Sequence, residues 1–479
     1  MRCSFAFLFL LILSLSAQSS SAAETKTKEE SLPADLGTRK AGIDWPSFLG
    51  PNGDGKSPEK GIRTKWRAAS PEEPGLKLLW NKPLGISYDP PTISRGRLFQ
   101  FDRFGGKARL YALNAQTGAL LWKYEYDTDY EDLYGYNNGP RCSPIVDGNR
   151  VYAYGVEGML LCVSADEGKE IWKVDTFKDF GVVQNFFGVG STPVVEGDLL
   201  LVMIGGSPPE SRRVAPGQLD RVEGNGSGVV AFDKRTGKVR YKITDELASY
   251  SSMKTATIGK RRWGFALCRG GLVGFEPATG KVDFHYPWRA ESLESVNASV
   301  PVVHDNQVFI SETYGPGSSL LEVAPGAHKV LWKDDENKRA KAMQAHWNTP
   351  VYHDGYLYGC SGRHMSNADL RCIDWKTGKV QWKIPDLTRT SLTYIDGHFL
   401  CLAEDGILRL FKADPTAYVE VTSMAIIPKP AGPRIGGEGS TAAEVDRDPF
   451  WAAPVVSHGL MYIRGGGKLF CYELIPEMK

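Results

Sequence analysis

The side chains best suited to binding chemistry stand just ahead of short segments that begin with proline and small residues. His346-Trp347-Asn348, for example, precedes Pro350. Aromatic rings beside amides and arginines offer stacking faces, donors and acceptors to a polar planar ligand, a sugar or a peptide strand. The residues that we predict to bind a ligand at a channel mouth are Asn138, Arg141, Asn185, Lys254, Asn297, His346, Trp347, Asn348, Arg389 and Trp451. The alternative is that these side chains fill a narrow channel by hydrogen bonding and stacking.

Familiar catalytic motifs are absent from the sequence. It holds no nucleophile elbow, no HExxH pair and no phosphate-cradling glycine loop; residues 224–228 resemble the last only in composition, because a strand and not a helix is expected to follow. His364 stands in a polar loop, where a lone histidine is usually a hydrogen-bonding surface group. No Cys/His spacing for zinc is present. We therefore predict no catalytic residue and no metal site.

A repeated motif positions the candidate binding residues. In residues 372–382, Asp374 caps a tight turn, Gly378 supplies the positive φ, and Trp382 follows four residues later. Other copies begin near Asn114, Asp166, Asp233 and Glu276 and end at Trp122, Trp172, Tyr241 and Phe284. An aromatic residue stands four residues past the glycine each time. Such self-similarity indicates a repeat architecture.

Each copy of the motif belongs to a unit of four antiparallel strands. A short first strand ends in a turn such as Asp354-Gly355, the strongest short-range hairpin pattern, and an apolar second strand follows. The units begin near Pro91, Pro144, Pro193, Ala256, Pro301, Pro350, Leu392 and Pro454. Without helical periodicity, units about 50 residues apart predict an all-β, eight-bladed β-propeller of four-stranded antiparallel blades.

The last unit ends after its third strand, at residues 470–474. Residues 76–80, at the other end of the chain, can supply the missing fourth strand and so leave no open sheet edge. The tryptophans that we expect to dock one blade on the next are Trp80, Trp122, Trp172, Trp332 and Trp382. Two segments interrupt the pattern. An insertion at 205–228 either covers the channel mouth or reaches outward, and a Pro/Gly-rich stretch at 427–439 is predicted to be a surface loop.

The N-terminal residues predict export. Arg2 and the short apolar run 5–15 resemble a cleavable signal peptide ending at Ala23, and no cysteine follows to make a lipobox. We predict a signal peptide at 1–23, a polar leader and strap at 24–75 and a propeller at 76–479. The strap is residues 44–55, with Trp45 and Phe48 as its expected anchors. The mature chain is expected to be periplasmic or secreted, with no transmembrane span.

Charge and cysteine content narrow the partners and the chemistry. Lys and Arg total 57 and Asp and Glu total 56, with no basic block, so nucleic acid is excluded as a partner. Seven cysteines follow the signal peptide, and Cys162, Cys372 and Cys471 occupy one site of the repeat that elsewhere holds alanine. A site that accepts Ala or Cys is a small buried site, so we predict free thiols. Cys360 and Cys372 form the one pair that could meet across a hairpin.

The Asp-x-x-Thr-Gly-x-x-x-Trp motif resembles the repeat of the pyrroloquinoline-quinone (PQQ)-like β-propellers over residues 76–474. That family includes quinoprotein alcohol dehydrogenases and the propeller subunit of the outer-membrane β-barrel assembly machine. The segment Asp44-Trp45-Pro46-x-Phe48-x-Gly50-Pro51 resembles a leader of exported propellers from planctomycete-type bacteria. A fold hosts many functions, so this resemblance leaves the activity open.

The resemblance implies two functions. The first is an exported scaffold, expected to be a monomer, that binds a protein or polysaccharide partner in the cell envelope without catalysis. The alternative is a quinoprotein oxidoreductase of the alcohol or sugar dehydrogenase type, using PQQ and Ca²⁺, for which Asp89, Asn297 and Glu312 are candidate ligands by their places in the repeat. Quinoprotein dehydrogenases carry a disulfide between adjacent cysteines, and this sequence has neither such a pair nor a CxxCH haem site. The first function is therefore favoured, with no cofactor.

Overall fold

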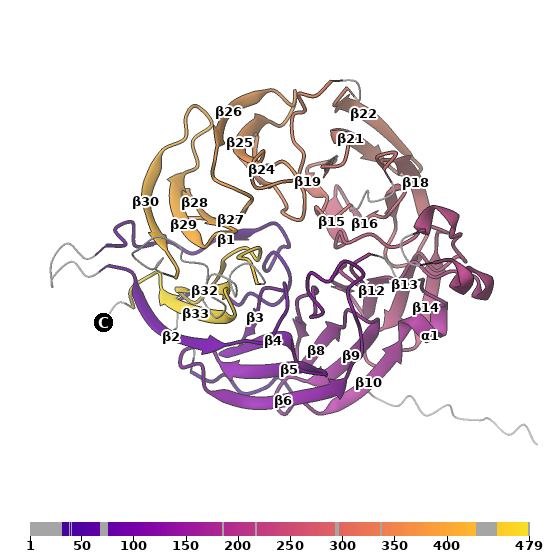
Figure 1. The fold of residues 1–479 in the computed structure, drawn as a ribbon, viewed down its shortest axis with the longest axis horizontal. Helices are drawn as coiled ribbons and strands as arrows, with labels where there is room; N and C mark the ends of the chain where they lie inside the picture. The colour runs from indigo at the N-terminus through magenta and orange to yellow at the C-terminus, as the bar shows by residue number, and fades with distance from the viewer. Residues whose placement is uncertain are drawn as a thin grey trace, which may run out of the picture. The chain divides into compact units, whose positions relative to one another are not determined.

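Eight antiparallel sheets stand around a ring (Figure 1): six are meanders of four consecutive strands, one carries β1 (Lys56–Ser57) as a fifth, parallel strand, and one takes its outer strand, β2 (Lys77–Pro83), from the N-terminal part of the chain. In this computed structural model the described residues are 31–479 except 38, 40, 68–74, 184–185, 216–217, 293–296, 336–337, 428–447 and 478–479. The chain divides into two units, 1–31 and 32–479, and the second contains the ring. The predicted signal peptide and most of the loop at 427–439 lie outside the described residues. The predicted fold class is confirmed.

The first four blades occupy the N-terminal half of the ring. Their strands are β3 (Thr92–Ser94), β4 (Arg97–Phe104), β5 (Lys107–Asn114) and β6 (Leu120–Asp127); β7 (Ile145–Asp147), β8 (Arg150–Tyr154), β9 (Met159–Ser164) and β10 (Glu170–Asp175); β11 (Val194–Glu196), β12 (Leu199–Met203), β13 (Val229–Asp233) and β14 (Val239–Ile243); β15 (Lys254–Ile258), β16 (Arg261–Leu267), β17 (Gly271–Phe275) and β18 (Val282–Pro287). The short helix α1 (Thr176–Phe180) follows β10, and the 3-10 helices η1 (Pro209–Arg213) and η2 (Leu219–Arg221) lie between β12 and β13. No helix among the described residues is long and apolar enough to cross a membrane.

The other four blades complete the ring. Their strands are β19 (Val302–His304), β20 (Gln307–Glu312), β21 (Gly317–Ala324) and β22 (Ala327–Lys333); β23 (Val351–His353), β24 (Tyr356–Ser361), β25 (Asp369–Asp374) and β26 (Val380–Pro385); β27 (Thr390–Ile395), β28 (His398–Ala403), β29 (Ile407–Lys412) and β30 (Glu420–Ala425); β31 (Val455–Ser457), β32 (Leu460–Gly465) and β33 (Lys468–Glu473). Strand β2 (Lys77–Pro83) pairs antiparallel with β33 and places Trp80 opposite Cys471. The N-terminal segment therefore closes the ring, as predicted.

The repeated tryptophans join neighbouring blades through one geometry. The Trp122 indole donates to the Ala165 carbonyl of the next blade at 3.0 Å, and its ring lies against Gly168. A Cβ on Gly168 would lie 2.4 Å from that ring, so the motif needs glycine for this contact as well as for its positive φ. The matching bonds run from Trp80 to Ala115 (3.2 Å), Trp172 to Lys234 (3.2 Å), Trp332 to Trp375 (2.9 Å) and Trp382 to Asp414 (3.0 Å).

The joint between blades 7 and 8 is built differently. Thr422 pairs with Leu410 at the register where other blades carry the aromatic residue. Ile62 and Trp66 from the N-terminal segment are buried in the hydrophobic cluster of this joint, together with Phe450. The N-terminal segment therefore supplies apolar volume that the repeat itself lacks here.

The seven described cysteines are buried and free. Cys372 lies opposite Tyr358 on β24, whereas Cys360 lies opposite Leu370, so the considered Cys360–Cys372 bridge is not formed. Burial raises the pKa of the Cys372 thiol to about 12, so the group stays a thiol at neutral pH.

The strap crosses the channel at the centre of the ring. Trp45 forms a bridge to Ile93 of β3, and the Pro46 carbonyl accepts from Val146 of β7 at 2.8 Å. Strand β1 (Lys56–Ser57) then pairs parallel with β27, beside which it lies near the centre of Figure 1. The strap thus touches blades on several sides of the ring. We call the end of the channel that it closes, where first strands turn into second strands, the strap mouth.

Candidate functional site

The opposite end of the channel carries most of the predicted binding residues. Because the strands of each blade are antiparallel, the loops leading into first strands and the loops joining second to third strands share this end. We call it the loop mouth. It is built from loops whose sequences differ from blade to blade, so it can present side chains that the repeat does not dictate.

Two tryptophans and an arginine stack at the loop mouth. The Trp347 and Trp451 ring centroids are 4.3 Å apart, and Tyr88 lies 4.6 Å from Trp451. The Arg389 guanidinium lies 4.3 Å from the Trp347 centroid, a cation–π distance. It also donates to both oxygens of buried Glu404 at 2.6–3.0 Å, and the Trp451 indole donates to the same carboxylate at 3.1 Å. Loops of blades 1, 6, 7 and 8 therefore meet in one rigid cluster.

Two further arginines stack on tyrosines beside this cluster. Arg141 lies 5.5 Å from the Tyr88 centroid and pairs with buried Asp132 at 2.6 Å. Arg363, in the loop after β24, lies 4.3 Å from the Tyr314 centroid. Arg363 is exposed and has no ion pair among the described residues. The two guanidinium groups therefore differ, since only the first is neutralised.

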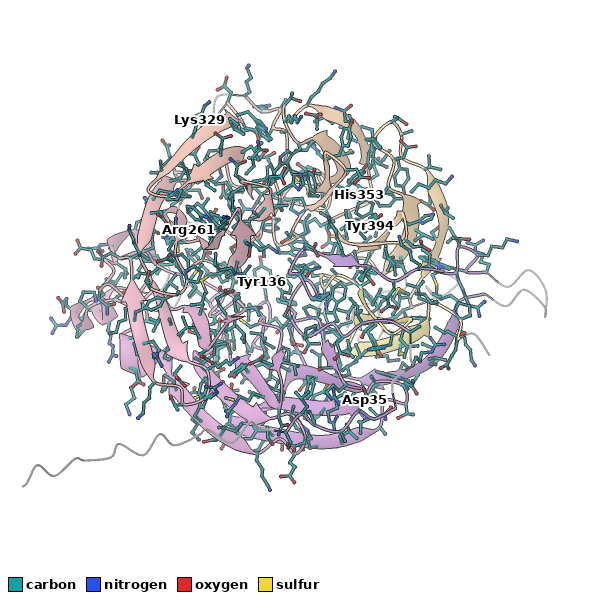
Figure 2. All side chains as sticks on the ribbon, turned by 180° about the vertical axis from the view of Figure 1, so that it is seen from behind. Asp35, Tyr136, Arg261, Lys329, His353 and Tyr394 are labelled. Carbon is teal, nitrogen blue, oxygen red and sulfur yellow. The ribbon has the colours of Figure 1, made fainter. Side chains whose placement is uncertain are left out.

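Exposed aromatic rings extend the loop mouth toward blades 2 and 3. Tyr134 is 50% exposed and Tyr136 is 66% exposed. Their centroids lie 5.7 Å and 6.0 Å from Phe187, which in turn lies 5.6 Å from Tyr250. Figure 2 shows Tyr136 near the middle of the ring, whereas Lys329 lies at its outer rim. Exposed aromatic rings grouped in this way are available for contact with a partner.

The predicted amides act within the loops. The Asn138 side chain accepts from the Asp132 amide at 2.8 Å. Asn348 accepts from the His346 amide at 3.1 Å and donates to the Cys360 carbonyl at 3.0 Å. These bonds fix the backbone that carries the aromatic and arginine side chains. Asn138 and Asn348 thus each make hydrogen bonds to the backbone of their own or a neighbouring loop.

The side-chain nitrogens of Asn297 and Lys254 also donate hydrogen bonds to carbonyls within the chain. Asn297 is 1% exposed and donates to the Cys268 carbonyl at 2.7 Å. The Lys254 ammonium donates to the Asn52 carbonyl of the strap at 2.6 Å, and burial lowers its pKa to about 8. Lys254 thus holds the strap inside the channel. Asn185 lies outside the described residues.

His346 is held neutral. Burial lowers the pKa of His346 to about 3, and Arg389, Arg363 and His364 lower it further through their charge. Its Nε2 lies 3.2 Å from the Tyr314 hydroxyl. A neutral imidazole whose Nε2 accepts from that hydroxyl carries its proton on Nδ1. The histidine can then offer an N–H group without adding charge.

The three residues considered for Ca²⁺, Asp89, Asn297 and Glu312, are all buried. Asp89 is fully buried, with Oδ2 accepting from Gln100 at 2.9 Å, and burial holds its pKa well above the usual range. A protonated carboxyl is a poor ligand for a hard cation. The nearby carboxylate of Asp448 is 2.6 Å from Arg464. Across the described ranges, no three His, Cys, Asp or Glu side chains lie close enough to hold a metal ion together.

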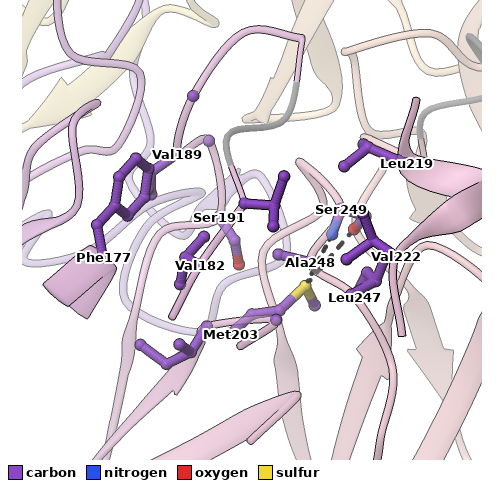
Figure 3. Close-up of a pocket in the computed structure, with 15 residues that line it drawn as sticks. Phe177, Val182, Val189, Ser191, Met203, Leu219, Val222, Leu247, Ala248 and Ser249 are labelled. Atoms are coloured by element: carbon purple, nitrogen blue, oxygen red, sulfur yellow. Dashed lines mark hydrogen bonds between the residues drawn. The ribbon is translucent and has the colours of Figure 1, made fainter. Parts of the chain in front are cut away.

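The insertion at 205–228 lies at the loop mouth, because it joins second strand β12 to third strand β13. Its Leu219 and Val222 are buried against Phe186, and Tyr250 and Tyr314 border this cluster. Leu219 and Val222 line a cavity of about 30 Å³. Figure 3 shows the two residues among those that border it. Since a buried water needs about 10–15 Å³, this cavity is too small for a planar cofactor. The insertion supports the aromatic rings of the mouth.

Sequence reasoning missed Tyr314, Arg363 and Glu404 as mouth residues. They follow second strands, whereas the predicted binding residues all lie in or next to the segments that lead into first strands. The antiparallel order was sufficient to find them, because it places both sets of loops at one end of the blade. The strand order could not predict that Arg389 pairs with Glu404, 15 residues further along the chain.

Comparison with known proteins agrees with the fold. The family model described as outer membrane protein assembly factor BamB matches residues 63–207 and 106–384. A polyvinylalcohol dehydrogenase of Pseudomonas sp is 24% identical over 60% of this chain and 38% of its own. A quinohemoprotein alcohol dehydrogenase of Pseudomonas putida is 26% identical over 35% and 21%. The chain thus spans about two fifths or less of the length of these curated relatives.

Solved structures show the same fold at low identity. BamB from Moraxella catarrhalis has a TM-score of 0.53 at 12% identity, covering 84% of this chain and 99% of its own. The quinohemoprotein alcohol dehydrogenase of Comamonas testosteroni has a TM-score of 0.55 at 12% identity, covering 91% and 81%. These likenesses concern the fold alone. Because the family model covers more than half of the sequence, the chain belongs to the family described as outer membrane protein assembly factor BamB, within the PQQ-like β-propellers.

Proposed function

We propose that this protein is an exported, non-catalytic binding module that holds a protein or polysaccharide partner of the cell envelope at its loop mouth. The family name places a relative in outer-membrane assembly, which supports an envelope location. The proposed form is a monomer in the periplasm or outside the cell.

The observation that carries this proposal is the exposed aromatic group of the loop mouth. Tyr134 and Tyr136 are 50% and 66% exposed, next to rings and arginines that are locked by stacking and ion pairs. Rigid aromatic side chains give a large contact area with little loss of conformational entropy on binding. Because the strap occupies the other mouth, a partner can approach the channel from one side only.

The oxidoreductase alternative is favoured by the names of the two dehydrogenase relatives and opposed by the chemistry of the mouth. The carboxylates of Asp132 and Glu404 are already paired with Arg141 and Arg389. Burial holds the pKa of Asp89 well above its usual range. We therefore infer that the mouth is better suited to binding a partner than to the divalent-cation chemistry and general base that a PQQ enzyme uses.

A binding assay with a paired variant tests the proposal. The chain from residue 24 onward is titrated with envelope fractions separated into polysaccharide and protein. We expect saturable binding to one fraction and a loss of about tenfold or more in the Tyr134→Ser/Tyr136→Ser variant, as for interface aromatic residues. Leu120→Ser is the control, since Leu120 is 54% exposed on the outer strand β6.

Two results contradict the proposal. Equal binding by the wild type and the double tyrosine variant would remove the loop mouth from recognition. Turnover of an alcohol or sugar in a dye-linked assay with added PQQ and Ca²⁺ would make the protein an enzyme.

A further inference from the structure

Arg363 is the starting point, because it is a cation without a counter-charge at a site where other arginines have one. Arg141 and Arg389 are each within 2.6 Å of a carboxylate oxygen. Arg363 stacks on Tyr314 and has no carboxylate partner among the described residues. Its guanidinium is thus available for a bidentate contact with an external anion.

Two buried ring nitrogens of the loop next to Tyr314 have no hydrogen-bond partner among the described residues. The indole Nε1 of Trp347 and the Nδ1 of His346 are buried and make no hydrogen bond within the described part of the chain. A buried donor left unsatisfied costs about 1–3 kcal/mol, so such groups call for an explanation. Both side chains belong to one loop, and the charges of Arg363 and Arg389 act on His346. The site therefore offers donors and positive potential together.

The backbone next to these donors is strained. Asp386, three residues before Arg389, adopts a φ of 63°, and Thr388, immediately before Arg389, adopts a φ of 60°. Positive φ is unfavourable for a β-branched residue, costs about 1–3 kcal/mol and tends to occur at ligand sites. The strained loop therefore lies in the same sector as the unpaired donors.

The backbone at the mouth is not free to pair with a peptide. Side-chain hydroxyls already bond the backbone of a neighbouring blade around the first strands. Two of them donate to carbonyls: Ser391 to Trp451 (2.7 Å) and Thr393 to Pro454 (2.5 Å). Three accept from backbone amides: Thr192 from Ser143 (3.3 Å), Ser252 from Thr192 (3.0 Å) and Thr349 from Val300 (3.0 Å). Peptide recognition by strand addition needs unpaired backbone groups. The mouth offers aromatic faces and N–H donors instead, which suit a sugar chain.

We propose that the Arg363 sector of the loop mouth binds the carboxylate of an acidic polysaccharide, with a uronic acid residue between Arg363 and the His346-Trp347 loop. The exposed rings of Tyr134 and Tyr136 would stack neighbouring sugar residues, since Tyr314 borders the aromatic cluster that also contains Phe187. This inference rests on the proposed binding function and names its partner class.

Titration with defined oligomers tests this inference. The chain from residue 24 onward is titrated by calorimetry with oligogalacturonate, its methyl ester and oligoglutamate of equal length. We expect binding to oligogalacturonate, at least tenfold weaker binding to the ester, and no binding to oligoglutamate. Arg363→Gln should weaken binding to oligogalacturonate about tenfold or more, because a charge-assisted bidentate contact is lost. Arg363→Lys should recover part of it.

The matched control is Arg235→Gln, since Arg235 is 52% exposed in a turn at the strap side of the ring. It should leave binding unchanged, and thermal unfolding of every variant checks the fold. Equal affinity for the ester, or full affinity of Arg363→Gln, would overturn the carboxylate site. Preference for oligoglutamate would make the partner an acidic protein. In each case envelope binding that still depends on Tyr134 and Tyr136 leaves the proposed function standing.

Discussion

The two mouths of the channel are built from different parts of the chain. At the strap mouth, the contacts are made by the backbone of the strap. Its amides and carbonyls form the Trp45–Ile93 bridge and the β1–β27 pairing, and its carbonyls accept from Lys254. At the loop mouth, side chains meet side chains, as in the Arg389–Glu404 pair. Backbone pairing closes a channel with little dependence on sequence, whereas side chains give selectivity. Under the proposed function, recognition belongs to the loop mouth, and we expect the strap mouth to contribute mainly stability.

Removing the strap should have the largest effect on this comparison. A chain that begins at residue 68 lacks β1 together with Ile62 and Trp66, both buried in the joint of blades 7 and 8. Deleting one buried tryptophan costs about 3–5 kcal/mol, so this truncation should abolish the single cooperative thermal transition. A chain that begins at Leu32 should unfold like the full chain. Calorimetry compares them, and equal melting temperatures would show that the strap mouth carries no stability.

Cutting the lysine contact should have a smaller effect. Lys254→Met leaves the carbonyls of Asn52 and Gly53 without their donor, at a cost of about 1–3 kcal/mol. We expect a lower free energy of unfolding in urea and faster proteolysis within the strap. Arg262→Met, at an exposed ion pair with Glu196, serves as the control because such pairs contribute about 0–1 kcal/mol. Unchanged proteolysis of the strap would contradict the holding role of Lys254.

The strap should also respond to pH. The carboxylate of Asp44 accepts a hydrogen bond from His458, which raises the pKa of His458. Burial opposes a low pKa for Asp44, but its hydrogen bonds, the one with His458 first, bring that pKa below its usual value. A raised histidine pKa gives stability that is present below pH 6.5 and lost as pH rises through the folded-state value. Both groups are partly exposed, so we expect about 0.5–1 kcal/mol. Urea unfolding from pH 5 to 8 should show this decline, and His458→Gln should remove it.

The smallest effect on stability should come from the loop mouth. Tyr136→Ser alters a side chain that is 66% exposed, so the free energy of unfolding should change by about 0.5 kcal/mol or less. Envelope binding should nevertheless weaken. A large loss of stability in urea unfolding would mean that the exposed rings also support the fold, and the division between the mouths would no longer hold.

Much of the fold could be predicted because most copies of the repeat carry the same turn and docking residues. Gly378 indicated the tight turn, and Trp382 indicated the side chain that docks on the next blade. Residues 76–80 were predicted to be the missing strand of the last blade. The joint of blades 7 and 8 could not be predicted, because Trp66 lies outside the repeat. The candidate site was predicted only in part: His346, Trp347, Arg389 and Trp451 do meet, but nothing in the sequence distinguishes them from the amides, which are used up within the loops.

The sequence alone determined the eight blades, the ring closure by Trp80 and the burial of the thiols, since each follows from contacts between residues at a fixed spacing. Only the tertiary structure decided which mouth is closed and which arginine lacks a counter-charge. Those properties depend on side chains from blades far apart in sequence, such as Arg389 beside Trp451 and Lys254 on Asn52. Their proximity arises from the curvature of the ring, which no local pattern encodes.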